Sequence, residues 1–160
     1  MDAQAYIAVV GAGVPDVDTD RIAEAVGRAL AANGAVLVCG GMSGVMEAAC
    51  RGAKAGGGTT VGILPTADRR DANPFVDVAV ATGMGEMRNA LVVRAADAVI
   101  AIRGETGTLS EVAFALKTGT PVVGIDTWEI LGVIALTDPE EAVAEALRLG
   151  RAPRPGRRVK

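Results

Sequence analysis

Three glycine-rich segments follow apolar runs in this chain of 160 residues, and each could bring backbone amides close to an anion. The second segment, GGMSG, precedes a helical pattern, where the first unpaired N–H groups and the positive end of the helix dipole attract phosphate. A tight turn with Ser43 as an ordinary helix cap explains the same residues equally well. The candidate ligand-binding residues of this segment are Gly40, Gly41, Met42, Ser43 and Gly44.

The third segment, GETGT, also precedes a helical pattern, which we expect to start at Thr108. Thr108 and Glu111 have the spacing of a capping box, in which the glutamate returns to the threonine amide and needs no further function. Glu111 lies off the apolar stripe of that helix, so it can point into a cleft instead. We treat Glu111 as a candidate catalytic residue, and the candidate ligand-binding residues here are Gly104, Glu105, Thr106, Gly107 and Thr108.

The first segment, with Gly11 and Gly13, resembles a dinucleotide fingerprint only in part, because Asp16 occupies the place of its third glycine. We therefore do not expect a nicotinamide dinucleotide site, although Gly11 and Gly13 remain candidate ligand-binding residues. The chain also has no GxxxxGK[ST] segment, which excludes a P-loop nucleotidase or kinase.

Arg88 is hard to explain as a purely structural residue. It falls within the apolar stripe of a helix expected over residues 84–96. A cation near a helix N-terminus is opposed by the dipole and cannot stay unpaired in a core. We expect Arg88 to reach over the carboxyl edge of a sheet into the cleft of the glycine loops, as a second candidate catalytic residue. The alternatives are a salt bridge to Glu86 and exposure to solvent.

The amino-acid composition excludes several kinds of catalytic and binding site. The chain contains no histidine, which excludes histidine general bases, imidazole metal sites and Ser-His-Asp systems, and we expect no metal site. The four aromatic residues supply no platform for stacking a nucleic-acid strand, so nucleic acid is an unexpected partner. Residues 151–160 are rich in Arg and Pro, and we expect a flexible basic tail there.

The two cysteines point to a reducing compartment. Cys39 and Cys50 lie in apolar surroundings without metal-ligand spacing, as expected of buried free thiols. The first residues lack the charged and apolar regions of a secretory signal, and no apolar run approaches the roughly 18 residues of a membrane span. We therefore expect a cytoplasmic protein without a membrane partner.

Seven short apolar runs alternate with helical patterns, and their near-continuous Val, Ile and Ala content is typical of strands covered on both faces. The fold class expected is α/β, a single doubly wound Rossmann-like domain over residues 1–150 with a mostly parallel sheet of six or seven strands. Helix caps are expected at Asp18 or Thr19, at Ser43 and at Thr108. The expected strands cover residues 6–11, 35–41, 59–65, 76–83, 97–104, 120–126 and 132–137.

The segments GGMSGVMEAACRGAKAGGGTTVGILP and GEMRNALVVRAADAVIAIRGETGTLSEVAFALKTGTPVVGI resemble the LOG-like Rossmann superfamily. That superfamily includes cytokinin riboside monophosphate phosphoribohydrolases and molybdenum cofactor carrier proteins, and was formerly called lysine decarboxylase-like. Its pattern is an Arg-Lys pair early in one helix and PGGxGTxxE at the start of the next. Arg88 matches the arginine, and Gly104, Gly107, Thr108 and Glu111 match the second motif. The chain departs from the pattern at Asn89, Arg103 and Glu105.

The resemblance implies two activities for one cleft. In the first, a phosphorylated small molecule, such as a nucleotide or a molybdopterin-type cofactor, is held or carried at the strand ends without turnover and without a required cofactor. In the alternative, a nucleoside 5′-monophosphate is hydrolysed to free base and ribose 5-phosphate. Lysine decarboxylation is not expected, because no lysine follows a strand end where a Schiff base would form. The resemblance also implies a homodimer or larger homo-oligomer, and Phe114 and Trp128 could anchor such an interface in a purely structural subunit.

Overall fold

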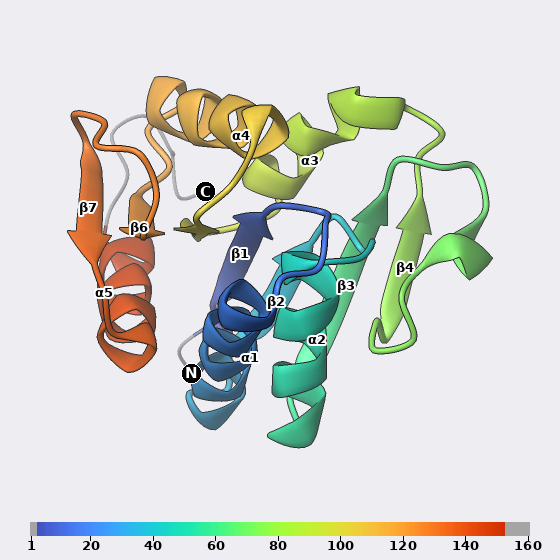
Figure 1. Ribbon diagram of the computed structural model, residues 1–160, viewed down its shortest axis with the longest axis horizontal. Helices are drawn as coiled ribbons and strands as arrows, with labels where there is room; N and C mark the ends of the chain where they lie inside the picture. Colours follow the sequence, from blue (N-terminus) through green and yellow to red (C-terminus); the bar gives the residue numbers. More distant parts are fainter. Residues whose placement is uncertain (1–2, 153–160) are drawn as a thin grey trace.

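The computed structural model describes residues 3–152, and the seven apolar runs form one parallel sheet (Figure 1). Each strand pairs with its neighbours in parallel register, as the expected fold class requires. The expected α/β Rossmann-like fold is therefore confirmed. The strands are β1 (Tyr6–Gly11), β2 (Val36–Cys39), β3 (Thr59–Leu64), β4 (Val78–Ala81), β5 (Ala98–Ile102), β6 (Val122–Ile125) and β7 (Val133–Leu136).

The strand order is β4-β3-β2-β1-β5-β6-β7, so the chain reverses its direction of travel across the sheet next to β1. From β1 the first half of the chain proceeds to β2, β3 and β4, and the second half starts again on the other side with β5. A crevice opens at such a switch point, outside the carboxyl ends of the strands, and doubly wound proteins bind ligands there. The topology places the ends of β1, β2 and β5 around this crevice.

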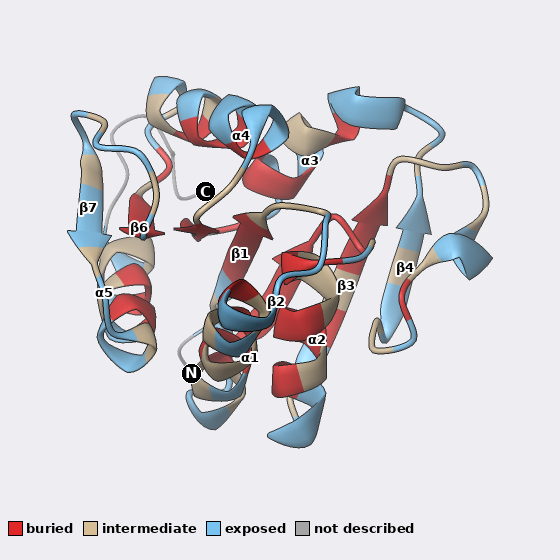
Figure 2. Cartoon of the chain, viewed as in Figure 1, coloured by how far each residue is buried: buried red, intermediate tan, exposed pale blue. Residues whose placement is uncertain are grey.

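Helices cover both faces of the sheet. The helices α1 (Val17–Ala32), α2 (Val45–Ala55) and α5 (Pro139–Arg151) pack on one face, and α3 (Asn89–Arg94) and α4 (Thr106–Lys117) on the other. Successive residues of β1 alternate between the two layers, with Ile7 and Val9 in the first and Ala8 and Val10 in the second. Figure 2 shows that burial is greatest in the central strands, whereas β4 and β7 at the edges are largely exposed.

The many small residues allow α1 and α2 to approach each other closely. A Cβ atom added at Gly27 would lie 2.0 Å from the Ala49 carbonyl oxygen, and one at Gly52 would lie 2.0 Å from the Glu24 carbonyl oxygen. Backbone atoms cannot yield as flexible side chains do, so both glycines are required by packing rather than by their conformation.

Three expected helix starts are wrong, although the helices themselves exist. Asp16, rather than Asp18 or Thr19, caps α1, because its carboxylate accepts the Thr19 amide at 3.0 Å. Gly44 is the N-cap of α2, and the Ser43 hydroxyl donates to the Gly13 carbonyl instead, at 2.7 Å. Helix α4 starts at Thr106, one half-turn before the expected Thr108. Thr108 and Glu111 therefore both lie inside the helix, and no capping box forms.

The helix expected over residues 84–96 is shorter and begins with a 3₁₀ turn. This turn, η2 (Gly85–Arg88), leads into α3, which ends at Arg94. The apolar stripe expected to face the core divides accordingly. Val92 and Val93 are buried, whereas much of the Met84, Met87 and Leu91 side chains is exposed to solvent.

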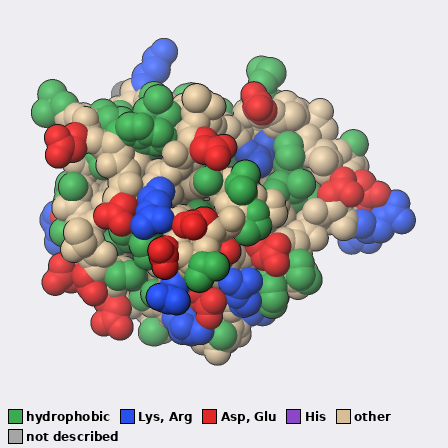
Figure 3. All heavy atoms as spheres, viewed as in Figure 1, with side chains coloured by type: hydrophobic (Ala, Val, Ile, Leu, Met, Phe, Trp, Pro, Cys, Tyr) green, Lys and Arg blue, Asp and Glu red, His purple; other side chains and the backbone are tan. Residues whose placement is uncertain are grey.

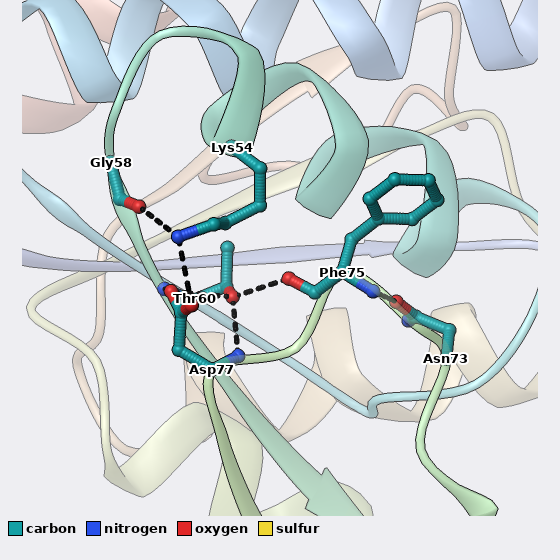
Figure 4. A network of polar contacts seen from close by, with 6 residues as sticks. All are labelled: Lys54, Gly58, Thr60, Asn73, Phe75 and Asp77. Atoms are coloured by element: carbon teal, nitrogen blue, oxygen red, sulfur yellow. Dashed lines mark hydrogen bonds and ion pairs between the residues drawn. The ribbon is translucent and has the colours of Figure 1, made fainter.

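A polar network fastens the connection between β3 and β4, which also contains the 3₁₀ turn η1 (Arg69–Asp71). Figure 4 shows the buried Thr60 hydroxyl donating to the Phe75 carbonyl at 2.6 Å and accepting from the Asp77 amide at 2.9 Å. The Asp77 carboxylate accepts the Thr60 amide and forms an ion pair of 2.8 Å with Lys54. Asn73, in the same connection, donates to the carbonyl of Met42, which fastens the GGMSG loop.

The basic C-terminal segment is described only at its beginning. Arg151 is the last residue of α5, and the rest of the expected flexible tail, residues 153–160, lies outside the described residues. On the face seen in Figure 3, Lys and Arg side chains are interspersed with Asp and Glu. Over residues 3–152, no helix is both long enough and apolar enough to cross a membrane.

Candidate functional site

A pocket of about 190 Å³ lies at the switch point beside the end of β1. Its wall comes from β1 and the loop that follows, the end of β2, the first turn of α2, the η2–α3 segment and the start of α4. Segments from several parts of the sequence therefore meet at the carboxyl edge of the sheet. The lining residues are Val9, Val10, Gly11, Ala12, Gly13, Gly40, Met46, Glu86, Arg88, Asn89, Glu105, Gly107, Thr108 and Glu111.

The structure brings most of the candidate residues of the first and third segments to this pocket, together with Arg88 and Glu111. Of the GGMSG segment only Gly40 reaches it. The candidates that line the pocket are Gly11, Gly13, Gly40, Arg88, Glu105, Gly107, Thr108 and Glu111. The candidates that the structure does not place in its wall are Gly41, Met42, Ser43, Gly44, Gly104 and Thr106.

The GGMSG loop turns away from the pocket because its polar groups already have partners. The Gly41 amide donates to the Cys39 sulfur at 3.3 Å, and the carbonyls of Gly41 and Met42 accept from Asn73. The Gly41 amide is a donor that a phosphate-binding loop would direct at its ligand, and here it is used within the protein, whereas the two carbonyls are acceptors that a phosphate could not use. The anion-binding potential of the site therefore comes from other residues.

Arg88 is almost fully buried, with 8% of its surface exposed. Its Nη1 donates to the Asn89 side-chain oxygen, and its Nη2 makes only a long contact of 3.5 Å with the Gly40 carbonyl. The Nε atom is buried and has no hydrogen-bond partner within residues 3–152. Burial lowers the pKa of this guanidinium, and the charge of Glu111 partly opposes that shift. A buried cation with an unused donor is costly unless a ligand completes its bonding.

Gly40 leaves the space in which the Arg88 guanidinium lies. A Cβ atom at this position would come within 2.5 Å of Nη2 and 2.7 Å of the Met46 sulfur. The glycine at the end of β2 thus serves the site by accommodating the arginine, whereas we expected it to cradle a phosphate.

Glu111 faces the same pocket from the second turn of α4 and is 7% exposed. Burial raises the pKa of this carboxyl to about 7, and the charge of Arg88 opposes the increase without cancelling it. The carboxyl group of Glu111 has no hydrogen-bond partner among the residues that the structure describes. Near neutral pH it is divided between a protonated form, which can donate to a ligand, and a charged form, which accepts.

The first turn of α4 supplies backbone donors to the pocket. The first N–H groups of any α-helix lack a partner within the helix, and Glu105, the N-cap of α4, makes no side-chain cap. Gly107 and Thr108 therefore bring uncapped amides to the wall that also contains Arg88. Glu86 and Glu105 also line the pocket, so acidic residues lie beside the anion-binding groups.

Six lining residues were not candidates from the sequence. Val9, Val10 and Ala12 adjoin the glycines of the first segment, so the position of β1 at the switch point could have indicated them. Glu86 and Asn89 lie within two residues of Arg88 in the sequence. Their polar side chains so close to the candidate arginine could have indicated them. Met46 gives no such signal, because an apolar residue in the first turn of a helix is typical of cores.

Arg103, where the superfamily motif has proline, joins three loops at the carboxyl edge. Its guanidinium forms an ion pair of 3.1 Å with Asp16, donates to the Thr19 hydroxyl at 2.7 Å and lies 3.7 Å from Asp126. The Arg103 carbonyl accepts from the Thr127 hydroxyl at 2.9 Å. This departure from the motif replaces a rigid residue by a bridge between the ends of β1, β5 and β6.

Metal binding finds no support in the part of the chain that the structure describes. Within residues 3–152, no group of three Cys, Asp or Glu side chains is arranged to hold a metal ion. The expectation of a site without metal remains a prediction.

The known proteins that are similar to this chain include the following three. An uncharacterised protein of Archaeoglobus fulgidus is 45% identical over 139 residues, which are 86% of this chain and 91% of that protein. The structure of the molybdenum cofactor binding protein of Rippkaea orientalis is 35% identical, with a TM-score of 0.84 over 91% of this chain and 96% of that one. The molybdenum cofactor carrier protein of Chlamydomonas reinhardtii is 31% identical, with a TM-score of 0.84 over 92% and 98% of the two chains.

The model of the SLOG cluster4 family matches residues 4–150, which include every residue that lines the pocket. The superfamily resemblance carried by Arg88 and by the GETGTLSE segment is thereby confirmed, together with the fold. On these grounds the chain belongs to the SLOG cluster4 family.

Proposed function

We propose that this protein binds a phosphorylated small molecule in the switch-point pocket and holds or carries it without turnover. The observation that carries the proposal is that the buried Arg88 guanidinium and the uncapped first turn of α4 line the same pocket. A phosphate would accept from both at once, and charge-assisted hydrogen bonds of this kind are among the strongest in proteins.

The carboxylates in the wall restrict the ligand further. Glu86 and Glu105 border the pocket and accept hydrogen bonds, so inorganic phosphate alone would meet like charges. A nucleotide or a molybdopterin-type ligand adds N–H and O–H donors to its phosphate and can satisfy both kinds of group. The similarity to proteins that bind or carry the molybdenum cofactor supports the same type of ligand.

Isothermal titration calorimetry with ribose 5-phosphate and with guanosine 5′-monophosphate tests the proposal. Arg88→Gln should weaken the binding of either compound about tenfold or more, because it removes a charge-assisted donor from a buried site. Arg94→Gln is the matched control, since Arg94 is exposed on α3 and stacks over the Phe114 ring. Circular dichroism checks the fold of both variants. Equal affinity of wild type and Arg88→Gln would refute the proposal.

The second candidate function is hydrolysis of a nucleoside 5′-monophosphate, which the shared pocket of Arg88 and Glu111 favours. Here the bond from C1′ to the base nitrogen breaks, water adds at C1′, and the base leaves with a proton. The charged Glu111 would stabilise the positive charge that develops at C1′, while Arg88 holds the phosphate. Release of free base, measured by chromatography and lost in Glu111→Gln, would favour hydrolysis over carriage.

We further propose that the protein forms a homo-oligomer in the cytoplasm. The exposed apolar side chains of Met84, Met87, Leu91 and Leu109, which lie along η2, α3 and α4, could contribute to an interface between copies. Size-exclusion chromatography with light scattering would give the oligomeric state directly.

A further inference from the structure

A second hollow lies next to the switch-point pocket, on the other side of the Arg103–Glu105 loop. It has a volume of about 360 Å³ and is lined by residues that follow β5 and β6: Arg103, Gly104, Asp126, Thr127 and Trp128. Glu105, the next residue of the same loop, lines the first pocket. In Figure 1 the ends of β5 and β6 lie beside each other and the loop rises from there to the start of α4.

The first pocket alone is too small to enclose a whole nucleotide-sized ligand. Its volume of about 190 Å³ lies below the range of roughly 300–1,000 Å³ that is usual for small-molecule sites. A ligand whose phosphate is held at Arg88 must therefore extend outward, and the neighbouring hollow follows along the same edge of the sheet.

The residues that line the second hollow favour a flat ring over a second phosphate. Trp128 is the one tryptophan in the sequence, and 38% of its surface is exposed. Exposed indoles stack readily on planar heterocycles. Arg103 gives little anion affinity here, because Asp16 and Asp126 flank its guanidinium. The Asp126 carboxylate instead offers an acceptor to a ring that carries N–H donors.

The backbone around the hollow is held in an uncommon conformation. Among residues 3–152, the non-glycine residues with positive φ are Arg103 at 46° and Asp126 at 50°, and both line this hollow. Positive φ is unfavourable for side chains such as arginine, and such strain concentrates at sites where a side chain must be aimed. The Thr127 hydroxyl, bonded to the Arg103 carbonyl, ties the two positions together.

We propose that this hollow is a subsite for the planar, N–H-bearing heterocycle of the ligand, which stacks on Trp128 and donates to Asp126 while its phosphate lies at Arg88. The inference rests on the proposed function of the first pocket. It specifies the ligand class as a phosphorylated compound with a guanine-like ring edge, in preference to a sugar phosphate alone or an adenine nucleotide.

Intrinsic fluorescence tests the subsite, because Trp128 is the sole tryptophan. Guanosine 5′-monophosphate should quench this emission with the same midpoint that calorimetry gives for binding, whereas ribose 5-phosphate should bind without quenching. Trp128→Leu should weaken guanosine 5′-monophosphate binding about tenfold and leave ribose 5-phosphate binding unchanged. Trp128→Phe keeps an aromatic ring and should retain most of the affinity.

Asp126→Asn tests the polar contact separately. It should reduce the preference for guanosine over adenosine 5′-monophosphate, because an adenine ring lacks the N1–H donor. Binding of guanosine 5′-monophosphate without quenching, and with equal affinity in Trp128→Leu, would overturn the subsite while leaving the proposed function intact.

Failure of ribose 5-phosphate and of guanosine 5′-monophosphate to bind at all would overturn both proposals. Dissociation of an oligomer in Trp128→Leu, seen by light scattering, would assign Trp128 to an interface between copies and would also overturn the subsite.

Discussion

Arg88 and Glu111 line the same pocket from different helices, yet the structure joins them by no ion pair within 4 Å. Each is nearly fully buried, and each is influenced by the charge of the other. Because both side chains line the pocket and they are not bonded to each other, a ligand in the pocket can contact both. This relationship is the basis of the proposed binding site, and it makes the titration of Glu111 a direct probe of it.

The stability of the protein should depend on pH through Glu111. The folded-state pKa is raised to about 7 from 4.5, so the folded protein binds the proton more tightly than the unfolded chain. The contribution of this carboxyl to the free energy of unfolding is therefore complete below about pH 4.5 and is lost as the pH rises to about 7. The free energy of unfolding should fall by up to about 3 kcal/mol across this window in wild type, relative to Glu111→Gln.

Denaturant unfolding of both proteins between pH 5 and pH 8 measures this difference. Glu145→Gln is a useful control, because a hydrogen bond from Arg148 lowers the pKa of that carboxyl. Glu145 is therefore charged in both the folded and the unfolded protein over this range, and its replacement should change stability by an amount that is nearly independent of pH. A stability difference between wild type and Glu111→Gln that does not change with pH would contradict the assignment.

The affinity for a phosphorylated ligand should also depend on the protonation state of Glu111. Deprotonation of Glu111 places a negative charge opposite the phosphate, so the affinity for a phosphorylated ligand should fall as the pH rises from 6 to 8. Titration of the phosphate itself contributes equally to wild type and Glu111→Gln. The ratio of their dissociation constants, measured by calorimetry at each pH, therefore isolates the carboxyl, and a constant ratio would remove Glu111 from the site.

Gly40→Ala should impair binding more than stability. The added Cβ would meet the ends of two flexible side chains, Arg88 and Met46, which can move at moderate cost. We expect the guanidinium to be displaced, with affinity reduced about tenfold and little change in the melting temperature. Combining Gly40→Ala with Arg88→Gln should cause no further loss. Additive losses in the double variant would show that Gly40 acts independently of Arg88.

Thr60→Val should destabilise the connection between β3 and β4. The substitution removes the hydroxyl that bonds the Phe75 carbonyl and the Asp77 amide, which leaves both groups without that partner. The expected loss is about 1–3 kcal/mol in the free energy of unfolding. Thr59→Val is the matched control at the exposed start of β3 and should change stability by less than about 0.5 kcal/mol. Similar losses in the free energy of unfolding for the two variants would show that the Thr60 network does not stabilise this connection.

The strands could be predicted closely because the sheet is buried on both faces. Each apolar run from Tyr6 to Leu136 contains a strand, and the expected bounds were at most two residues too long at either end. Helices between most of the strands favour parallel order, but β6 and β7 pair in parallel without a helix between them. The helix starts were less predictable, since Ser43 and Thr108 have the residue type of a cap but have other partners or positions.

The part of the site that could be predicted is the part where a residue type does not suit the environment expected from the sequence. Arg88 in an apolar stripe required a special environment, and the structure gives it one at the pocket. The GGMSG loop shows the limit of local patterns. Its glycines suggest a phosphate cradle, but Asn73, some thirty residues later, holds its carbonyls and fixes it in another role. Neither the GGMSG segment nor the sequence around Asn73 indicates a contact between residues so far apart in the chain.

The small molecule that copurifies with the protein tests the central claim most directly. Mass spectrometry of the native protein, followed by phosphorus analysis of the released ligand, should find a phosphorylated compound in wild type and in Arg94→Gln but not in Arg88→Gln. A phosphorus-free ligand in wild type, or the same phosphorylated ligand retained in full by Arg88→Gln, would contradict the account.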